Sequence, residues 1–328
     1  MEWEWAGRDL MKRMTNNSRV GDALSNRLLF LLSARLHEQV LAVHPLKNGK
    51  WLIQTDSNKW FLKRYSSYEQ LKKQIMLTEV LLDKGFKRVI PYRLLSPVED
   101  GSHFYAVMPF IPSADQSFSF RTKREREEAL ALLSAFHQVT ASFSKEWQEV
   151  VPAMNQLVRW QNRLRWFIRD LPVLSMYFSP QLLRRYAEMG EWCLQTLMKR
   201  RLKPRSPVII HGDVAAHNFF RTDQGKLLLI DFDLAQKAPA MYDYLQWSNR
   251  VLPILQWNLP RLMEHKELEI YRTDEEFRIF LMYPTDVYRE CRRFILADPK
   301  DKGWLFSHVC KIAIRSFKQR EEFFLKWT

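Results

Sequence analysis

The first third of the chain alternates between short apolar runs and turn residues, which is the pattern of an antiparallel sheet. Lys47-Asn48-Gly49-Lys50 and Asp56-Ser57-Asn58 separate the first three runs. Two amphipathic stretches, residues 22–36 and 68–84, instead repeat their apolar positions at helical spacing, and Gly85 follows the second at a C-cap position. The pattern predicts strands at residues 40–46, 51–55, 59–65, 92–96 and 104–108.

Beyond residue 108 the apolar positions recur mainly at helical spacing. Pro109 and Pro112 bracket a stiff connector, so we expect a domain boundary that divides the chain into residues 1–108 and 109–328. Thr273 and Glu276 have the spacing of a capping box. One helix face is expected at Ala129, Leu132, Leu133, Phe136 and Thr140, and further helices at residues 152–169, 180–202, 273–297 and 304–327.

Composition excludes several classes of protein. With 46% hydrophobic and 13% aromatic residues, the 328-residue chain has ample material for a core and is not disordered. Its three cysteines are scattered without a Cys-x-x-Cys pair, which argues against a disulfide framework or a zinc site. The start, Met-Glu-Trp-Glu-Trp, lacks a signal pattern, and no apolar run is long enough for a membrane span. We therefore expect a cytoplasmic protein.

The net charge of +14 raises the question of a nucleic-acid partner. Most of the surplus lies in residues 121–205, where a solvated basic helix face is the simplest interpretation and an anionic substrate or acidic partner is the alternative. No motif of sequence-specific nucleic-acid binding accompanies it. Residues 206–258, with 4 basic and 5 acidic side chains, are the one slightly acidic segment.

That acidic segment contains the most specific motif of the chain. An apolar run ends in His211-Gly212-Asp213, Asn218 follows five positions later, and a hairpin turn leads to a second apolar run that ends in Asp231-Phe232-Asp233. Phosphoryl transfer from a nucleotide requires a carboxylate beside the attacking hydroxyl, and an amide and a carboxylate that hold magnesium on the phosphates. The spacing predicts a kinase of small molecules.

This arrangement resembles the aminoglycoside phosphotransferase and choline kinase group of protein-kinase-like enzymes, over about residues 40–244. The resemblance looks closest to bacterial kinase-like proteins associated with the spore coat. It implies an α+β, bilobal protein-kinase-like fold, with a small antiparallel-sheet N-lobe that binds the nucleotide and a larger helical C-lobe. It also implies ATP, with GTP as the alternative, and Mg²⁺ as cofactors.

Site residues carry over from the family motif position by position. Asp213 matches the catalytic base, and Asn218 and Asp231 match the metal ligands. Asp233 is expected to assist the metal or to bond the backbone, and His211 to brace the loop. Two further residues, His217 and Asp243, are expected to be structural, the latter by bracing the catalytic loop.

The N-terminal half supplies the remaining candidates. Lys63 lies in a short apolar strand, where an ammonium needs an anionic partner; the family offers the nucleotide phosphates and a helix glutamate, here Glu79, with Glu69 as the alternative. Arg64 points to the opposite face by strand alternation. The adenine site is expected at the connector Met108-Pro109-Phe110-Ile111-Pro112, where the apolar side chains of Phe110 and Ile111 would enclose the purine, although an apolar connector packed as plain core fits almost as well.

Two departures from the family pattern affect the functional prediction. Residues 44–50 contain one glycine and lack the glycine-rich loop that closes over phosphates, which puts nucleotide affinity in question. Only twelve positions separate Asp231 from Asp243, too few for an activation loop, which favours a small hydroxylated substrate over a protein. The alternatives are a catalytically weak scaffold, such as a spore-coat component, and a true protein kinase.

The substrate region also carries a charge signal. Residues 292–328 have nine basic and four acidic side chains, whereas a site for a polycationic aminoglycoside would be acidic. We therefore expect a neutral or anionic acceptor; the oligomeric state is not indicated.

Overall fold

The computed structural model describes residues 30–46, 49–94, 96–101, 103–143, 151–200 and 202–328. The chain divides into two compact units, of which the first comprises Met1–Val151 with His211–Ala235 and the second Pro152–Ile210 with Gln236–Thr328. The segment that carries the Asp213 and Asp231 motifs therefore belongs to the same unit as the N-terminal sheet. The division of function at residues 108 and 109 stays a prediction. Of the helix predicted at residues 22–36, only residues 30–36 lie within the described part, and they are helical.

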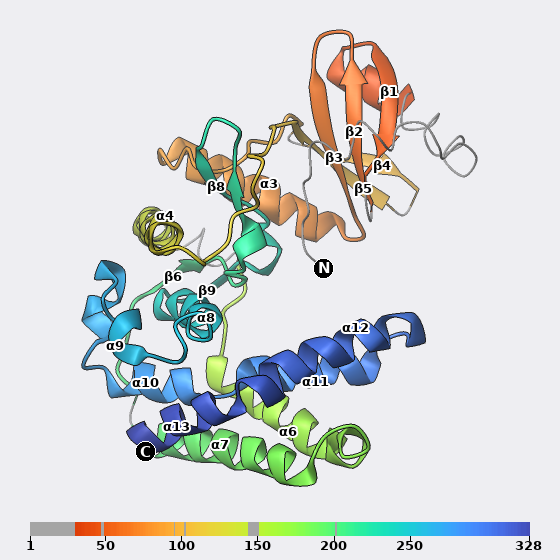
Figure 1. Cartoon of the computed structure of the whole chain (residues 1–328). Helices are drawn as coiled ribbons and strands as arrows, with labels where there is room; N and C mark the ends of the chain where they lie inside the picture. The colour runs from red at the N-terminus through yellow and green to blue at the C-terminus, as the bar shows by residue number, and fades with distance from the viewer. Residues whose placement is uncertain (1–29, 47–48, 95, 102, 144–150, 201) are drawn as a thin grey trace. The chain divides into compact units, whose positions relative to one another are not determined.

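The first unit is built around a five-stranded antiparallel sheet with the order β1-β2-β3-β5-β4 (Figure 1). Its two faces follow from strand alternation. Trp60 and Leu62 point to one face and pack with Leu32 and Leu36 of the helical residues 30–36. The strands are β1 (Val40–Pro45), β2 (Lys50–Thr55), β3 (Lys59–Tyr65), β4 (Val98–Asp100) and β5 (His103–Pro109).

Helix α3 (Tyr68–Asp83) covers the other face of this sheet, where Leu71 and Ile75 pack against Tyr65 and Ala106. The side chain of Ser67 caps its N-terminus, and Gly85 follows its end with φ +84°, a left-handed conformation that glycine adopts without strain. The predicted helix and its glycine stop are confirmed.

The strand predicted at residues 92–96 is wrong. The edge of the sheet is formed by β4 at Val98–Asp100. Of the described residues in the predicted stretch (92–94 and 96), Arg93 makes one backbone bond to the sheet, from its N–H to the carbonyl of Val107 at 2.8 Å. Tyr92 is apolar enough to be taken for a strand residue, but it is only partly buried and packs against α3 and the sheet instead.

The rest of the first unit consists of helix α4 (Lys123–Ala141) and the motif segment. Helix α4 buries the predicted face from Ala129 to Thr140, and Thr122 and Glu125 form a complete capping box. In the motif segment a 3₁₀ turn, η1 (Ala216–Asn218), precedes the hairpin of β7 (Phe219–Arg221) and β8 (Leu227–Leu229), and a second turn, η2 (Phe232–Leu234), follows it.

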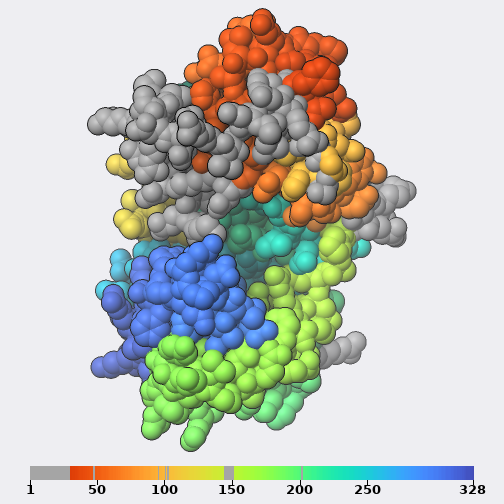
Figure 2. All heavy atoms as spheres, turned by 90° about the vertical axis from the view of Figure 1, so that its right-hand side faces the viewer, coloured from red at the N-terminus to blue at the C-terminus, as the bar shows by residue number. Residues whose placement is uncertain are grey.

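The second unit is helical apart from one small ladder, in which β6 (Pro207–Ile210) pairs antiparallel with β9 (Gln236–Pro239). Figure 2 shows the green helices α6 and α7 directly against the blue C-terminal helices. The α-helices are α6 (Gln156–Leu174), α7 (Pro180–Lys199), α8 (Met241–Val251), α9 (Leu259–Leu262), α10 (Glu275–Met282), α11 (Thr285–Leu296), α12 (Pro299–Val309) and α13 (Phe317–Trp327), with a 3₁₀ helix at Lys266–Tyr271 and a π-helical turn at Cys310–Arg315.

Three helix predictions for this unit need correction. The helix expected over residues 304–327 is interrupted, because α12 ends at Val309, a π-helical turn covers Cys310–Arg315 and α13 begins at Phe317. The helix expected over residues 273–297 is two helices, because Pro284 separates α10 from α11. Thr273 does not cap it; the side chain of Asp274 accepts from the N–H of Phe277 at 3.1 Å and serves as the N-cap. Within the described residues, none of the helices has both the length and the apolar character needed to cross a bilayer.

Candidate active site

Strand alternation in β3 directs Lys63 into a cavity of the first unit. Lys63 shares its face of the strand with Phe61 and Tyr65, and all three line the cavity, while Trp60 and Leu62 enter the core on the other face. The neighbouring strand β5 places Met108 opposite Phe61 on the same side. An ammonium is thus carried by a well-packed sheet and held rigidly at one side of the cavity.

The Lys63 ammonium lies between two carboxylates. Its Nζ is 3.1 Å from Oδ1 of Asp231 and 3.4 Å from Oδ2 of Asp233, and it stands 4.7 Å from the ring centroid of Tyr65. Burial by itself would lower the pKa of Lys63, but the two carboxylates outweigh it and raise that pKa above its usual value. Lys63 is therefore charged at every physiological pH.

Backbone geometry brings Asp231 to this lysine. Asp231 has φ +68°, so the chain turns sharply as strand β8 ends and η2 begins. Asp is one of the few residue types that adopt this left-handed conformation readily, although it still costs free energy. Such strain is typical of residues held in place for function.

The two carboxylates have opposite pKa shifts. Burial tends to raise the pKa of Asp231, but Lys63 holds it below its usual value. Asp233 is raised to a pKa of about 6, first by burial and then by the negative charge of Asp231. The Asp231–Asp233 pair therefore binds one proton at a higher pH than an isolated carboxylate would.

The Asp213 loop is tied to the end of β8 by two residues. The Nδ2 of Asn218 donates to the carbonyl of Asp213 at 2.8 Å and to its Oδ2 at 3.2 Å, and the carbonyl of Asn218 accepts from the N–H of Ile230 at 3.0 Å. His211, which is fully buried, accepts from the N–H of Asp213 at Nδ1 (3.3 Å) and contacts the carbonyl of Ile230 through Nε2 (2.9 Å). Both connections lead to the residue that precedes Asp231.

These contacts fix the tautomer of His211. Since Nδ1 accepts a hydrogen bond, the proton must lie on Nε2, which donates to the carbonyl of Ile230. With both ring nitrogens engaged inside the fold, His211 is a bracing residue and is not placed to take a proton from a substrate.

Asn218 also presents an oxygen that suits a metal ion. Its amide nitrogen bonds Asp213, so its Oδ1 faces the other way; this atom is buried and finds no hydrogen-bond partner among the described residues. Within the same part of the chain, no group of three or more His, Cys, Asp and Glu could hold a metal alone. An amide and a carboxylate fit Mg²⁺, which is commonly held by one or two protein oxygens together with substrate phosphates.

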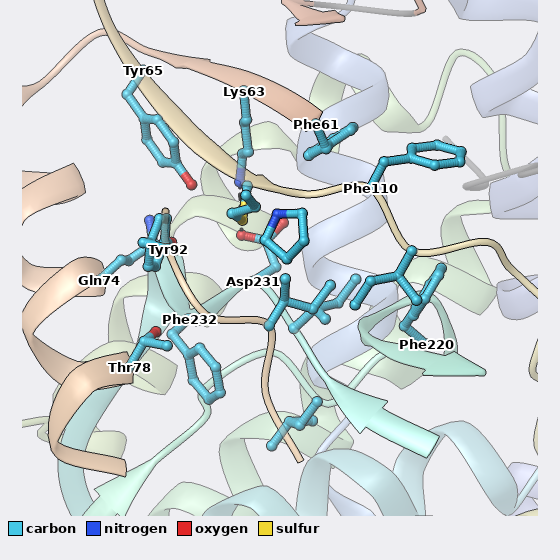
Figure 3. A pocket seen from close by; sticks show the side chains of 16 residues that line it. Phe61, Lys63, Tyr65, Gln74, Thr78, Tyr92, Phe110, Phe220, Asp231 and Phe232 are labelled. Carbon is cyan, nitrogen blue, oxygen red and sulfur yellow. Dashed lines mark hydrogen bonds and ion pairs between the residues drawn. The ribbon is translucent and has the colours of Figure 1, made fainter. Parts of the chain in front are cut away.

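The cavity beside Lys63 is polar at one end and aromatic at the other (Figure 3). Lys63, Gln74 and Asp231 gather at the polar end, and Phe61, Phe110 and Phe220 at the aromatic end (Figure 3). Met108, Pro109 and Ile111 complete the lining near the connector. This division suits a ligand with a flat apolar part and a charged part.

The connector offers one backbone donor to such a ligand. The N–H of Phe110 is already bonded to the carbonyl of Lys59 at 3.0 Å. For the N–H of Ile111, by contrast, the described residues provide no acceptor. Of the predicted adenine-site residues, Met108 and Phe110 both line the cavity.

The prediction that Glu79 anchors Lys63 is not met. In the described residues the ion pairs of Lys63 are those with Asp231 and Asp233, and Glu79 is half-exposed outside the buried face of α3. The buried face instead includes Gln74 and Thr78, and the Gln74 amide donates to Oδ1 of Asp233. The alternative, Glu69, is exposed.

Sequence reasoning also missed Lys50. Lys50 lies directly opposite Lys63 in the β2–β3 pairing, so both lysines point to the same side of the sheet. Burial, followed by the charge of Lys63, lowers the pKa of Lys50 to about 8. The sequence offered one signal for Lys50: a lysine directly follows Gly49, in the segment that lacks the glycine-rich loop.

The structure also describes the two residues that were expected to be structural. His217 is exposed in η1, and Asp243 is fully buried in the first turn of α8 in the second unit. The bracing role of Asp243 stays a prediction.

Comparison with known proteins supplies the family. Residues 44–265, more than half of the chain, match the model described as the phosphotransferase enzyme family. The chain belongs to this family. A search of curated proteins found no match.

Solved structures of related proteins show that this phosphotransferase has a protein-kinase-like fold. An aminoglycoside phosphotransferase from Alicyclobacillus acidocaldarius has a TM-score of 0.66 at 18% identity, covering 90% of this chain and 94% of that one. A spectinomycin phosphotransferase bound to AMP also has a TM-score of 0.66, at 15% identity, with 89% and 99% covered. The choline kinase of Streptococcus pneumoniae has 0.53 at 16% identity, with 88% and 98% covered.

Proposed function

We propose that this chain is an ATP- and Mg²⁺-dependent phosphotransferase that transfers a phosphoryl group to a hydroxyl of a small molecule in the cytoplasm. The observation that carries the proposal is the hydrogen-bonded connection from Asp213 through Asn218 to Ile230, next to the Lys63–Asp231 pair. This connection joins a candidate base to a candidate phosphate site within one unit. Membership of a phosphotransferase family supports it.

The charged end of the cavity would bind the triphosphate. Lys63 and Lys50, adjacent on two strands, would contact phosphate oxygens and neutralise their charge. Asn218 through Oδ1 and Asp231 through its carboxylate would hold Mg²⁺, with Asp233 beside them. The metal, when bound, neutralises charge on the phosphates during transfer.

Asp213 would act as the base for the acceptor hydroxyl. Its carboxylate is oriented by the Asn218 amide, and its backbone by His211, so its position does not depend on the substrate. In a reaction that is mainly positional, the carboxylate orients the hydroxyl and accepts its proton late.

The aromatic end of the cavity would hold the base of the nucleotide. Phe61, Met108 and Phe110 offer apolar surfaces, and the N–H of Ile111 offers a hydrogen bond. Relatives have been solved with AMP and, for an aminoglycoside 2′-phosphotransferase, with GDP. We propose ATP as the donor and keep GTP as the alternative.

The test is the substitution Asp213→Asn, with Asp223→Asn in the exposed hairpin turn as a matched control. A metabolite screen with ATP consumption as readout identifies an acceptor first. We expect Asp213→Asn to lower turnover by about 10²- to 10⁴-fold, because general-base catalysis contributes that much, while the Kd for Mg-ATP stays nearly unchanged. Equal turnover in Asp213→Asn and wild type would remove this mechanism.

A second function is favoured by the glycine-poor segment between β1 and β2. A catalytically weak protein that binds nucleotide or partners, such as a spore-coat component, would keep the cavity without needing turnover. Stabilisation by Mg-ATP without any ATP hydrolysis or acceptor phosphorylation would favour it. The resemblance to spore-coat-associated kinase-like proteins remains a prediction.

A further inference from the structure

Helix α3 presents only uncharged side chains to the interior of the first unit. Among the described residues, the carboxylates within ion-pair distance of the Lys63 ammonium are those of Asp231 and Asp233. The negative charge that Lys63 needs therefore comes from the turn η2 and the residue before it, and not from the helix. The buried residues of α3 are Leu71, Gln74, Ile75, Leu77, Thr78 and Leu81.

Asp233 directs its two carboxylate oxygens to two different elements. Its Oδ2 lies 3.4 Å from Nζ of Lys63 on β3, and its Oδ1 accepts a hydrogen bond from the side-chain amide of Gln74 on α3. An ionised carboxylate only accepts hydrogen bonds, so the NH₂ group of Gln74 is the part of the amide that faces it. Asp233 thus connects the helix to the lysine.

Gln74 is a polar residue in an otherwise mostly apolar helix face. Its side chain is buried and points to the polar end of the cavity (Figure 3). A buried amide destabilises a fold unless it is hydrogen-bonded, and Asp233 supplies the acceptor. The preceding residue, Lys73, reaches the same region, with its Nζ 3.5 Å from the carbonyl of Ala235. Two consecutive residues of α3 therefore fix the helix to η2 and the residue that follows it.

The two carboxylates beside Lys63 have different tasks in the proposed reaction. As a proposed ligand of Mg²⁺, Asp231 would lose most of its attraction for Lys63, because the charge of the ion would offset its own. The oxygens of Asp233 are instead directed to Gln74 and Lys63. The charge of Asp233 therefore stays available to Lys63 while Lys63 contacts the phosphates.

Resting on the proposed function, we propose that Gln74 and Asp233 together position Lys63 for phosphoryl transfer, in place of the helix carboxylate expected at Glu79. Asp233 supplies the charge and Gln74 fixes the direction of that charge, so both act through Lys63. Their contribution would be large because phosphoryl transfer depends mainly on position and electrostatic stabilisation, and small displacements of the groups involved lower the rate strongly.

The test exchanges the amide and the carboxylate between the two residues. Gln74→Glu places a second carboxylate against Asp233, Asp233→Asn removes the charge, and the double variant moves the carboxylate to α3 while an amide still faces it. Each single variant should lower kcat about tenfold or more, with the Kd for Mg-ATP nearly unchanged, and the double variant should recover most of the loss. The controls are Gln70→Glu, one turn earlier on α3 at a partly exposed position, and Asp223→Asn in the exposed hairpin turn, and both should behave as wild type does.

Thermal melting of the same proteins separates positioning from a purely structural role. Asp233→Asn relieves repulsion from Asp231, so at neutral pH it should melt no lower than wild type although its kcat falls. Equal kcat in Asp233→Asn and wild type, or a double variant no faster than the slower single variant, would overturn the positioning role. A higher Mg²⁺ requirement in Asp233→Asn that Gln74→Glu does not share would make Asp233 a metal ligand, which also overturns it.

Urea denaturation adds a readout that does not depend on turnover. The proteins are wild type, Gln74→Met, Asp233→Asn and the double variant with both changes, and Gln74→Met removes the donor without adding a charge. We expect the two changes to be non-additive, because they remove one shared contact. If they are non-additive but no acceptor hydroxyl is phosphorylated, the Gln74–Asp233 unit stands and the proposed function fails. If wild type transfers phosphate while the changes are additive and leave kcat unaltered, the proposed function stands and the positioning role fails.

Discussion

Two adjacent lysines, Lys50 and Lys63, point to the same side of the sheet, and the charges of Asp231 and Asp233 act on both. In a kinase-like site the backbone N–H groups of a glycine-rich loop ordinarily bind phosphate oxygens. This chain lacks those glycines, and Lys50 stands where the second strand begins. We interpret Lys50 as the group that supplies the missing positive charge.

Replacement of Lys50 tests this interpretation. Lys50→Met should weaken Mg-ATP binding by about tenfold, equivalent to about 1.4 kcal/mol, because one charge-assisted contact is lost. In wild type, binding should also weaken as the pH rises above about 8, where Lys50 loses its proton, and Lys50→Met should lack this dependence. Isothermal titration calorimetry from pH 6.5 to about 9 measures both effects.

Lys59→Met serves as the control for that experiment, because Lys59 is an exposed lysine at the start of the same strand as Lys63. It should bind Mg-ATP as wild type does. Unchanged affinity in Lys50→Met would show that the segment between β1 and β2 does not contact the phosphates through this side chain.

Asp233 predicts a pH dependence of stability. Its raised pKa means that the folded protein binds this proton more tightly than the unfolded chain does, so its contribution to stability falls as the pH rises from about 4 to about 6. Asp233→Asn should therefore be more stable than wild type by roughly 1–3 kcal/mol above pH 6, and the gain should shrink as the pH falls towards 4.

Urea denaturation of both proteins at pH 4.5, 6 and 8 measures that difference. Asp231 acts in the opposite direction at lower pH, since its lowered pKa stabilises the fold until that carboxylate is protonated. A constant difference across this range would mean that the two carboxylates do not repel one another.

At the scale of elements, the loop after β6 explains why a glycine precedes Asp213. Gly212 has φ +80°, and a Cβ at this position would lie 2.0 Å from the carbonyl oxygen of Leu234 in η2. The close approach of these two backbones brings the loop of Asp213 next to the turn that carries Asp231. A larger residue here would push them apart.

Gly212→Ala is therefore expected to destabilise the fold by roughly 3 kcal/mol or more, because a backbone clash adds to the strain of a left-handed conformation. Gly225→Ala is the matched control: its φ is +79°, but a Cβ added there would meet no described atom within 4 Å. That control should cost only about 1 kcal/mol. Equal losses, measured by chemical denaturation, would rule out the close approach at Gly212.

Helices and strands were predicted correctly where the apolar periodicity extends over many residues. The predictions failed where the packing of a single residue determines the local structure. The face of α4 from Ala129 to Thr140 and the three hairpin strands were predicted correctly. The strand predicted at residues 92–96 failed because Tyr92 packs by itself, partly buried, against α3 and the sheet, and no continuous ladder accompanies it in the described part of this stretch. Gln74 was missed because its role depends on the side of α3 that faces the sheet.

At the scale of the whole molecule, the net charge of +14 sets the kind of acceptor that we expect. The nine basic side chains of residues 292–328, against four acidic ones, disfavour a polycation. The solved structures that resemble this chain include an aminoglycoside phosphotransferase. We therefore expect this chain to share their fold but to act on a different class of acceptor.

We predict that kanamycin and related aminoglycosides at micromolar concentration cause no increase in ATP turnover. A coupled assay of ADP release measures this, and any phosphorylated antibiotic can be detected by mass spectrometry. Antibiotic-dependent turnover at micromolar drug would contradict the charge argument, although it would leave the assignments of Asp213 and Asp231 intact.

The sequence alone identified the candidate site, because Asp213, Asn218 and Asp231 follow one another at short range around two apolar strands and a hairpin turn. Because these spacings are short, the sequence shows which side chains lie just beyond the end of each strand. Only the tertiary structure decided the partners: Lys63 with Asp231 and Asp233 in place of Glu79, and Lys50 beside Lys63. Those contacts join elements far apart in the chain, and strand register and helix rotation, which pair them, are set by packing of the whole unit.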